Sequence, residues 1–299
     1  MEKPRILHFL TPLPNLSPFD VNMACDAGFA VAGYTGIALH EVTALTQDAM
    51  FSRAPQDAAK TVLFIGGRDA MLALDMTEAA KKAMFPPFEI SIFADPSGAF
   101  TTAAAMVAVA EKHLMKHGGR LAGAKVAVFG AKGVVAGVVG IILAEAGADV
   151  TLVGHDRSDA VAKKAEGFQQ RFGTIFRVAD GSSEDGRRAA LAEADLVFVA
   201  ARAGIQVLSR DDLAKAPRLK VAADVNAVPP PGIEGVSAQA DGVALGVGDG
   251  AVGVGALAVG NIKFRVQHGL LQRLHDANKA AIFDFRDAYR LARDLIAGG

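Results

Sequence analysis

The sequence predicts an α/β fold built as two lobes. Short runs of β-branched and aliphatic residues alternate with longer segments whose apolar residues have helical spacing. Such alternation is typical of a parallel sheet covered by helices on both faces. The chain has 299 residues, of which 51% are hydrophobic, so two domains with substantial cores are expected.

The first lobe begins with three predicted strands at residues 5–10, 61–65 and 90–94. Between them lie segments with helical spacing, and Pro86-Pro87 breaks the chain before the third strand. The segments with helical spacing are 17–29, 41–51 and 68–85.

A long helix is expected next, in the segment 97–119. Ser97 is the predicted N-cap, and Gly118-Gly119 ends the helix. We expect this helix to bridge the two lobes.

Strand and helix signals then alternate again, as a βαβαβ unit with further strands attached. Predicted strands are 125–130, 149–154, 175–180, 195–200 and 220–226, and predicted helices are 133–146, 158–172 and 183–193. Residues 227–250 are loop-rich, and two helices, 262–276 and 279–297, close the chain without a further strand. The expected domains are therefore 1–119 with 262–299, the catalytic lobe, and 120–261.

The turn FGAKGVVAG, at 129–137, follows a buried-type strand and opens a helix. Small residues allow the backbone to approach a pyrophosphate, and the helix directs unpaired N–H groups and its positive dipole end at the anion. A second strand follows at the spacing of a Rossmann-type dinucleotide-binding domain. The expected cofactor-binding residues here are Gly130, Ala131, Lys132, Gly133, Val134 and Val135.

The segment after the second strand of this unit bears on which dinucleotide binds. His155 and Arg157 could hold a ribose 2′-phosphate, whereas Asp156 could accept hydrogen bonds from a free 2′-hydroxyl. This mixture favours NADP as the cofactor, with NAD possible.

Composition excludes several other classes of function. The formal net charge is −1 with interspersed signs, which argues against a nucleic-acid partner. The longest apolar run is too short to span a membrane, and a single cysteine, Cys25, fits a reducing cytoplasm. We expect Cys25 to pack in the core. His113 and His117 share a helix face, but without a third ligand they indicate a solvated helix end and no metal site.

Several segments, in this order, resemble the bacterial NAD(P)-dependent methylene-tetrahydromethanopterin dehydrogenases, a branch of the methylene-tetrahydrofolate dehydrogenase group. Besides the glycine-rich turn they are SPFDVNMACDAGF, GYTG, FIGGRDA, DPSGAFTTAAA, DVNAVPPPGI and GVGALAVGNIKF. The resemblance covers nearly the whole chain. TPLPNLSPFDVNMA and FSRAPQD are most similar to the branch that accepts both NAD and NADP.

The resemblance implies a cytoplasmic oxidoreductase of one-carbon metabolism and methylotrophy, a homo-oligomer that is a trimer or a multiple of one. The reaction that the resemblance implies is oxidation of methylene-tetrahydromethanopterin to the methenyl form. Hydride leaves the carbon between two nitrogens, so no general acid or base is obligatory. Orientation of the rings and a field that tolerates the developing cation are what the protein must supply.

The resemblance also implies roles for particular side chains. Lys263 orients the pterin, Thr102 contacts substrate, and Phe19 shapes the pterin site. The alternatives are a solvated lysine on the closing helix, a helix-capping role for Thr102 or its neighbour Thr101, and, equally, a core position for Phe19. Asp20 could stabilise the methenyl cation or bind the pterin's amino groups. Asp95 ends a strand where open sheets place ligands, although a turn-forming role before the proline is an equal alternative. The two remaining positions are Gln267, where some relatives carry a histidine, and Asn226, which contacts the nicotinamide or forms an Asx turn.

Three other functions fit parts of the pattern. The nearest is a methylene-tetrahydrofolate dehydrogenase, or an enzyme that uses both carriers. A dehydrogenase of hydroxy- or keto-acids on the same plan requires a Lys/Asp pair, and the pattern around Lys60, Lys81 and Lys82 does not indicate one. A redox sensor that binds NADP without chemistry would need no second pocket.

Overall fold

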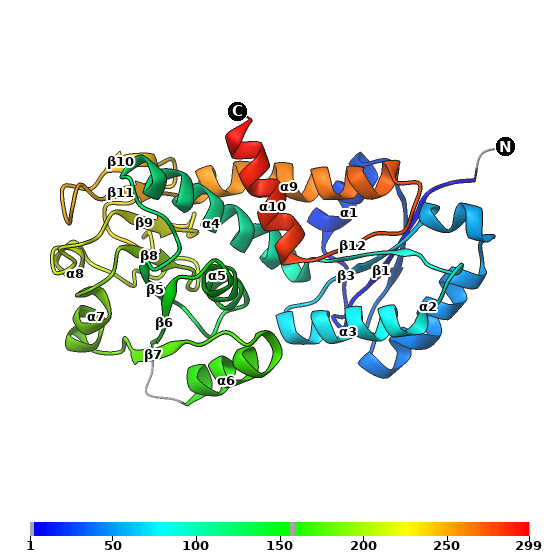
Figure 1. Ribbon diagram of the computed structural model, residues 1–299, viewed down its shortest axis with the longest axis horizontal. Coiled ribbons are helices and arrows are strands. Elements are labelled where there is room, and N and C mark those ends of the chain that lie inside the picture. The colour runs from blue at the N-terminus through cyan, green and yellow to red at the C-terminus, as the bar shows by residue number, and fades with distance from the viewer. Residues whose placement is uncertain (1–2, 156–158, 299) are drawn as a thin grey trace. The chain divides into compact units, whose positions relative to one another are not determined.

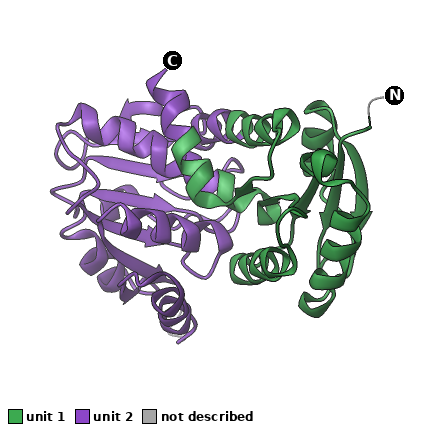
Figure 2. Cartoon of the chain, turned by 45° about the vertical axis from the view of Figure 1, so that its right-hand side comes forward, with its two compact units in different colours: residues 1–101, 264–291 green, residues 102–263, 292–299 purple. Residues whose placement is uncertain are grey.

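A computed structural model of the protein describes residues 3–155 and 159–298. The chain forms two compact units (Figure 2). Unit 1 comprises residues 1–101 and 264–291, and unit 2 comprises 102–263 and 292–299. These units differ from the expected domains chiefly in the long helix that follows residue 97, because most of that helix belongs to unit 2.

Unit 1 contains a parallel sheet with the strand order β12-β4-β3-β1-β2. The predicted strands are confirmed as β1, β3 and β4, and two further short strands occupy the edges. The strands are β1 (Ile6–Leu10), β2 (Ala30–Tyr34), β3 (Thr61–Ile65), β4 (Ser91–Ala94) and β12 (Ile282–Phe283).

Helices cover both faces of this sheet, as right-handed crossover connections require. Helix α1 connects β1 to β2 on one face, and α2 and α3 lie side by side on the other (Figure 1). The helices with residues in unit 1 are α1 (Pro18–Asp26), α2 (Val42–Phe51), α3 (Ala70–Ala83), α4 (Ala99–Lys116), α9 (Ala256–Asp276) and α10 (Phe285–Ala297).

Two expectations for unit 1 are wrong. The chain was expected to close with two helices and no strand, but β12 lies between α9 and α10 and pairs with β4. Cys25 was expected in the core, yet it is exposed, because α1 buries Met23 and Ala24 and turns Cys25 outward.

Unit 2 contains a sheet with the order β10-β11-β9-β8-β5-β6-β7. Its strands pair in parallel except β10, which is antiparallel to β11. The strands are β5 (Lys125–Phe129), β6 (Asp149–Gly154), β7 (Arg177–Asp180), β8 (Leu196–Val199), β9 (Val221–Asp224), β10 (Asp241–Ala244) and β11 (Val252–Val254). The region 227–250, expected to be loop, thus contains the edge strand β10.

The order of strands in unit 2 reverses between β5 and β8, both of which are almost entirely buried. Helices α5 and α6 follow β5 and β6 in one direction along the sheet, whereas α7 returns over the other face to β8 (Figure 1). Ligands of open α/β sheets bind at such a reversal, beyond the carboxyl ends of the strands. The helices are α5 (Val134–Glu145), α6 (Ala160–Phe172), α7 (Glu184–Leu191) and α8 (Arg210–Leu213).

The C-terminal part of α4 is held against the edge strand β10. His113 Nε2 lies 2.6 Å from Asp241 Oδ1, and Lys112 Nζ donates to the same carboxylate at 3.0 Å. His113 is only 4% exposed. The expectation of a solvated helix end is therefore wrong for His113, although His117, one turn later, is exposed.

Candidate active site

The glycine-rich turn connects β5 to α5 at the point where the strand order of unit 2 reverses. Gly130 has a φ of 80°, and a Cβ added there would lie 2.6 Å from the carbonyl oxygen of Ala200. Only glycine fits such a position, because both its backbone conformation and the space beside it exclude a side chain. The loop therefore keeps its backbone open to a ligand.

Helix α5 begins at this turn with Gly133 as N-cap, and no side chain caps it. The first N–H groups of the helix are thus not satisfied by a cap, which is the arrangement that binds phosphate. Ala131 is fully buried, Lys132 is exposed, and Val134 and Val135 are partly buried. The predicted residues Gly130 to Val135 are thus the turn and the first two residues of α5, and their contact with a pyrophosphate stays a prediction.

A lysine that the sequence did not indicate also lies at this turn. Lys164, on α6, donates hydrogen bonds to the carbonyl oxygens of Lys132 and Gly133 at 3.0 and 2.7 Å. Its ammonium group holds the turn and places a positive charge beside the expected phosphate site. The sequence gives no signal for this contact, because Lys164 has the position of an ordinary polar residue on the amphipathic helix α6 and its partners lie about 30 residues earlier in the chain.

A cavity of about 220 Å³ lies next to the turn, at the carboxyl ends of β5, β6 and β7. Its lining includes Gly130, His155, Ser182, Arg187 and Arg202. His155 lines this cavity, and its contact with a ribose 2′-phosphate stays a prediction. The other two residues expected there, Asp156 and Arg157, lie outside the described residues.

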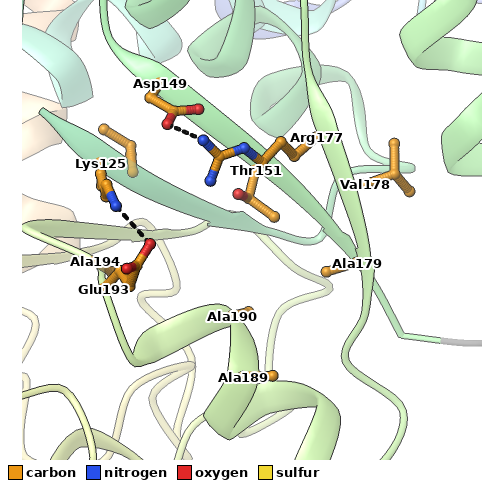
Figure 3. Close-up of a pocket in the computed structure, with 11 residues that line it drawn as sticks. Lys125, Asp149, Thr151, Arg177, Val178, Ala179, Ala189, Ala190, Glu193 and Ala194 are labelled. Atoms are coloured by element: carbon orange, nitrogen blue, oxygen red, sulfur yellow. Dashed lines mark hydrogen bonds and ion pairs between the residues drawn. The ribbon is translucent and has the colours of Figure 1, made fainter. Parts of the chain in front are cut away.

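A second hollow, of about 240 Å³, lies at the amino ends of the same strands, β5, β6 and β7 (Figure 3). The ammonium of Lys125 pairs with Glu193 at 2.5 Å, and Arg177 pairs with Asp149. Each cation of this hollow has a carboxylate partner.

The loop after β9 is organised by two buried polar side chains. Asp224 accepts hydrogen bonds from the N–H groups of Asn226 and Ile233, and burial raises the pKa of its carboxyl group. Asn226 Oδ1 accepts from the N–H groups of Val228 and Gly204, so it forms the Asx turn that was one of two alternatives. Its predicted contact with the nicotinamide stays a prediction.

In unit 1, the start of α1 brings two candidate residues to one place. Phe19 is 47% exposed, which rules out the core alternative for that ring. Asp20 is 4% exposed, and its Oδ1 accepts a hydrogen bond of 2.6 Å from Nε2 of Gln267 on α9. Two polar residues selected separately from the sequence are thus direct partners in a buried pair.

The start of α4 is capped differently from the expectation. Ser97, the predicted N-cap, has a φ of 52° and donates its hydroxyl to the carbonyl of Gly67 at 2.6 Å. Asp95 instead accepts from the N–H of Phe100 and from the hydroxyl of Thr101, at 2.9 and 2.7 Å. Asp95 therefore positions the first turn of α4, and its contact with substrate stays a prediction.

The two adjacent threonines are consequently different. Thr101 is fully buried and bonded to Asp95, whereas Thr102 is partly exposed. Thr101 therefore helps to hold the carboxylate that caps α4, and the substrate contact of Thr102 stays a prediction.

Lys263 lies on α9 one turn before Gln267, so the two side chains project from the same side of that helix. Its side chain is partly exposed. Among residues 3–155 and 159–298, no group of three or more His, Cys, Asp or Glu side chains is arranged to hold a metal ion. Within the same residues, no helix is both long and apolar enough to cross a membrane.

Comparison with known proteins identifies the family of this chain. A family model described as "Methylene-tetrahydromethanopterin dehydrogenase, N-terminal" matches residues 18–97. The NAD(P)-dependent methylenetetrahydromethanopterin dehydrogenase of Methylorubrum extorquens is 50% identical over 97% of this chain and 98% of its own. The chain belongs to the methylene-tetrahydromethanopterin dehydrogenase family.

Two further relatives are more distant. The "Bifunctional protein MdtA" of Methylorubrum extorquens is 30% identical, over 93% of this chain and 94% of that protein. Among solved structures, shikimate 5-dehydrogenase from Listeria monocytogenes, in complex with shikimate and NAD, has a TM-score of 0.56 at 13% identity. It covers 98% of this chain and 96% of its own, and at that identity the likeness concerns the fold alone.

The sequence did not single out Arg187 and Arg202, which line the cavity beside the glycine turn. Arg187 is on α7 and Arg202 follows β8, so sheet order brings them together and no local motif does. The available signal was their position just beyond the carboxyl ends of β7 and β8, where ligands of such sheets bind.

Proposed function

We propose that the protein oxidises methylene-tetrahydromethanopterin to methenyl-tetrahydromethanopterin, with NADP, or NAD, as the hydride acceptor. The observation that carries this proposal is 50% identity over nearly the full length of a dehydrogenase with that name, in a chain whose turn at Gly130 has the geometry of a pyrophosphate site. When bound, the dinucleotide supplies the nicotinamide ring that accepts the hydride.

The residues at the start of α5 hold the cofactor. The N–H groups that follow Gly133 face the pyrophosphate, and the ammonium of Lys164 adds a positive charge beside them. Lys132 lies at the exposed rim of the turn. None of these groups takes part in proton transfer, and their function is binding and orientation.

In the catalytic lobe, the exposed ring of Phe19 provides an apolar surface for the pterin. As hydride leaves, positive charge develops over the two nitrogens that flank the reacting carbon. The carboxylate of Asp20, held in place by Gln267, stabilises this charge. A fixed carboxylate in a buried setting is more effective than a mobile one, because it does not reorganise during the reaction.

Lys263 and Thr102 orient the substrate. A cation beside a developing cation would slow the reaction, so Lys263 donates to a pterin carbonyl oxygen away from the reacting carbon. Thr102 offers a hydroxyl from the first turns of α4, whose start Asp95 fixes. Positioning of this kind is worth several powers of ten in rate, because it replaces the entropy cost of aligning two rings.

The proposal includes a cytoplasmic location and a homo-oligomeric assembly. Its direct test compares initial rates of the purified protein with methylene-tetrahydromethanopterin and with methylene-tetrahydrofolate, followed by the absorbance of reduced nicotinamide. Reduction with the methanopterin carrier is the expected result. Reduction with the folate carrier alone would show that the enzyme acts on folates, and reduction with neither would favour a sensor.

A further inference from the structure

The cavity beside the glycine turn differs in charge from the hollow at the amino ends of the same strands. In the hollow of Figure 3, Lys125 and Arg177 are neutralised by Glu193 and Asp149. The cavity at the carboxyl ends of the strands has two arginines and a histidine in its lining, and no carboxylate among its described lining residues. Arg187 pairs with Asp212, which lies outside that lining, whereas Arg202 has no described carboxylate partner. A surface of this kind attracts an anion.

Arg202 is the more exposed of the two arginines in this cavity. It follows β8, and within residues 3–155 and 159–298 its side chain has no ion-pair or hydrogen-bond partner. Its guanidinium group is therefore available to a ligand without breaking any contact of the described protein.

Arg187 is held in a fixed orientation. Its Nε donates to Oδ2 of Asp212 at 3.3 Å, and its Nη1 lies 3.5 Å from the carbonyl oxygen of Gly181. Asp212 is buried, and its Oδ2 also accepts from the N–H and hydroxyl of Ser209, at 3.0 and 2.9 Å. These contacts leave part of the guanidinium directed into the cavity, where it can donate further hydrogen bonds.

We propose that Arg202 and Arg187 together bind the 2′-phosphate of NADP, with Asp212 as a positioning residue for Arg187. The inference rests on the proposed function in that it assumes a dinucleotide at the glycine turn. It assigns the selectivity for NADP over NAD to Arg187 on α7 and to Arg202 after β8, in addition to the turn after β6.

The physical reason is charge. A phosphate monoester is close to a dianion at neutral pH, and arginine pairs with it through planar, charge-assisted hydrogen bonds. The corresponding group of NAD is a neutral hydroxyl, which gains little from an arginine. Sites selective for NAD instead present a carboxylate to that hydroxyl, and no described residue of this lining does so.

The test uses the full chain and two probes, adenosine 2′,5′-bisphosphate and adenosine 5′-monophosphate, with dissociation constants from calorimetry. The wild-type protein should bind the bisphosphate more tightly. Arg202→Gln should weaken the bisphosphate by about 10- to 100-fold, the loss expected for a charge-assisted contact, and leave the monophosphate unchanged. Asp212→Asn should lower the ratio of the two affinities by a smaller factor, which a purely structural defect would not do.

The matched control is Arg177→Gln, which removes an arginine from the hollow of Figure 3 and should change neither affinity. The inference is overturned if wild type does not prefer the bisphosphate, if Arg202→Gln and Arg187→Gln both bind it like wild type, or if they weaken both probes equally. It is also overturned if Arg157→Gln alone abolishes the preference.

Because no pterin is present, these outcomes are distinct from failure of the proposed reaction. A protein that prefers the bisphosphate through Arg202 but reduces no nicotinamide would retain this inference and lose the proposed function. If wild type and Arg202→Gln both oxidise the pterin equally well with NADP and with NAD, the proposed function is retained and this inference is lost.

Discussion

Gln267 Nε2 donates a 2.6 Å hydrogen bond to Oδ1 of Asp20, although the two residues are 247 positions apart in the chain. Both side chains are buried, at 0% and 4% exposure. The bond joins the first turn of α1 to α9 within unit 1, and it fixes the carboxylate that we assign to stabilising the pterin cation.

Asp20→Asn removes this charge while keeping an oxygen that can accept from Gln267. We expect kcat to fall by about 100-fold, the loss typical of removing one electrostatic contact to a transition state. The free energy of unfolding should change little, because the hydrogen bond is retained. Steady-state rates and denaturant unfolding measure the two effects.

Gln267→Met provides the comparison, because it breaks the bond and keeps the charge. It should destabilise the protein and reduce kcat less than Asp20→Asn does. Unchanged kcat in Asp20→Asn would show that the carboxylate has no electrostatic role.

Gly130→Ala tests the turn at the start of α5. The added methyl group would meet the carbonyl of Ala200 at 2.6 Å, so we expect loss of dinucleotide affinity as well as lower stability. Gly123→Ala is the matched control, because Gly123 also has a φ of 80° but has no atom within 4 Å of an added Cβ. It should cost only the strain of a left-handed residue, about 1 kcal/mol, with cofactor affinity unchanged. Equal dinucleotide affinities in the two variants would contradict the assignment of the turn at Gly130 as the pyrophosphate site.

Thr101→Val and Thr102→Val should distinguish the structural role of Thr101 from the substrate contact proposed for Thr102. Thr101→Val removes a buried hydroxyl bonded to Asp95 and should lower the free energy of unfolding by about 1–3 kcal/mol. Thr102→Val should leave stability within about 0.5 kcal/mol and lower kcat/KM. Thermal unfolding and initial rates check the pair. A reversed pattern would assign the substrate contact to Thr101.

Stability should decline as the pH falls below about 6.5, and His113 should contribute to this decline. Burial lowers the pKa of His113 below its ordinary value of 6.5, by more than the hydrogen bond to Asp241 raises it. The unfolded chain therefore binds a proton more readily than the folded one, so the contribution is fully present above pH 6.5 and is lost on acidification.

His113→Asn should reduce the difference in unfolding free energy between about pH 7.5 and about pH 5.5. His117→Asn, at an exposed residue directly after the same helix, should leave that difference unchanged. If the two substitutions have the same effect, the buried pair with Asp241 is not its source.

The strongly apolar strands could be predicted from the sequence, whereas three of the four edge strands could not; β7 is the exception. The buried strands β3 and β5 are long aliphatic runs. The edge strands β2, β10 and β12 contain no fully buried residue, so their pattern does not distinguish them from loops. The glycine turn was recognisable because one local segment contains all of its features.

The sequence could not predict contacts that depend on sheet order or on distant helices. The bond between Asp20 and Gln267, and the joint lining of one cavity by Arg187 and Arg202, join segments with no shared periodicity. Ser97 resembles an N-cap in sequence, but the buried carboxylate of Asp95 takes that role because it accepts two hydrogen bonds from Thr101 and one from Phe100.

The most direct measurement is the fate of deuterium placed on the carbon that the pterin carries. The purified protein would receive methylene-tetrahydromethanopterin with both hydrogens of that carbon replaced by deuterium, together with NADP, and the products would be analysed by mass spectrometry. Transfer of one deuterium to the reduced nicotinamide is the predicted result. Appearance of the label in solvent, or unlabelled reduced nicotinamide, would contradict direct hydride transfer.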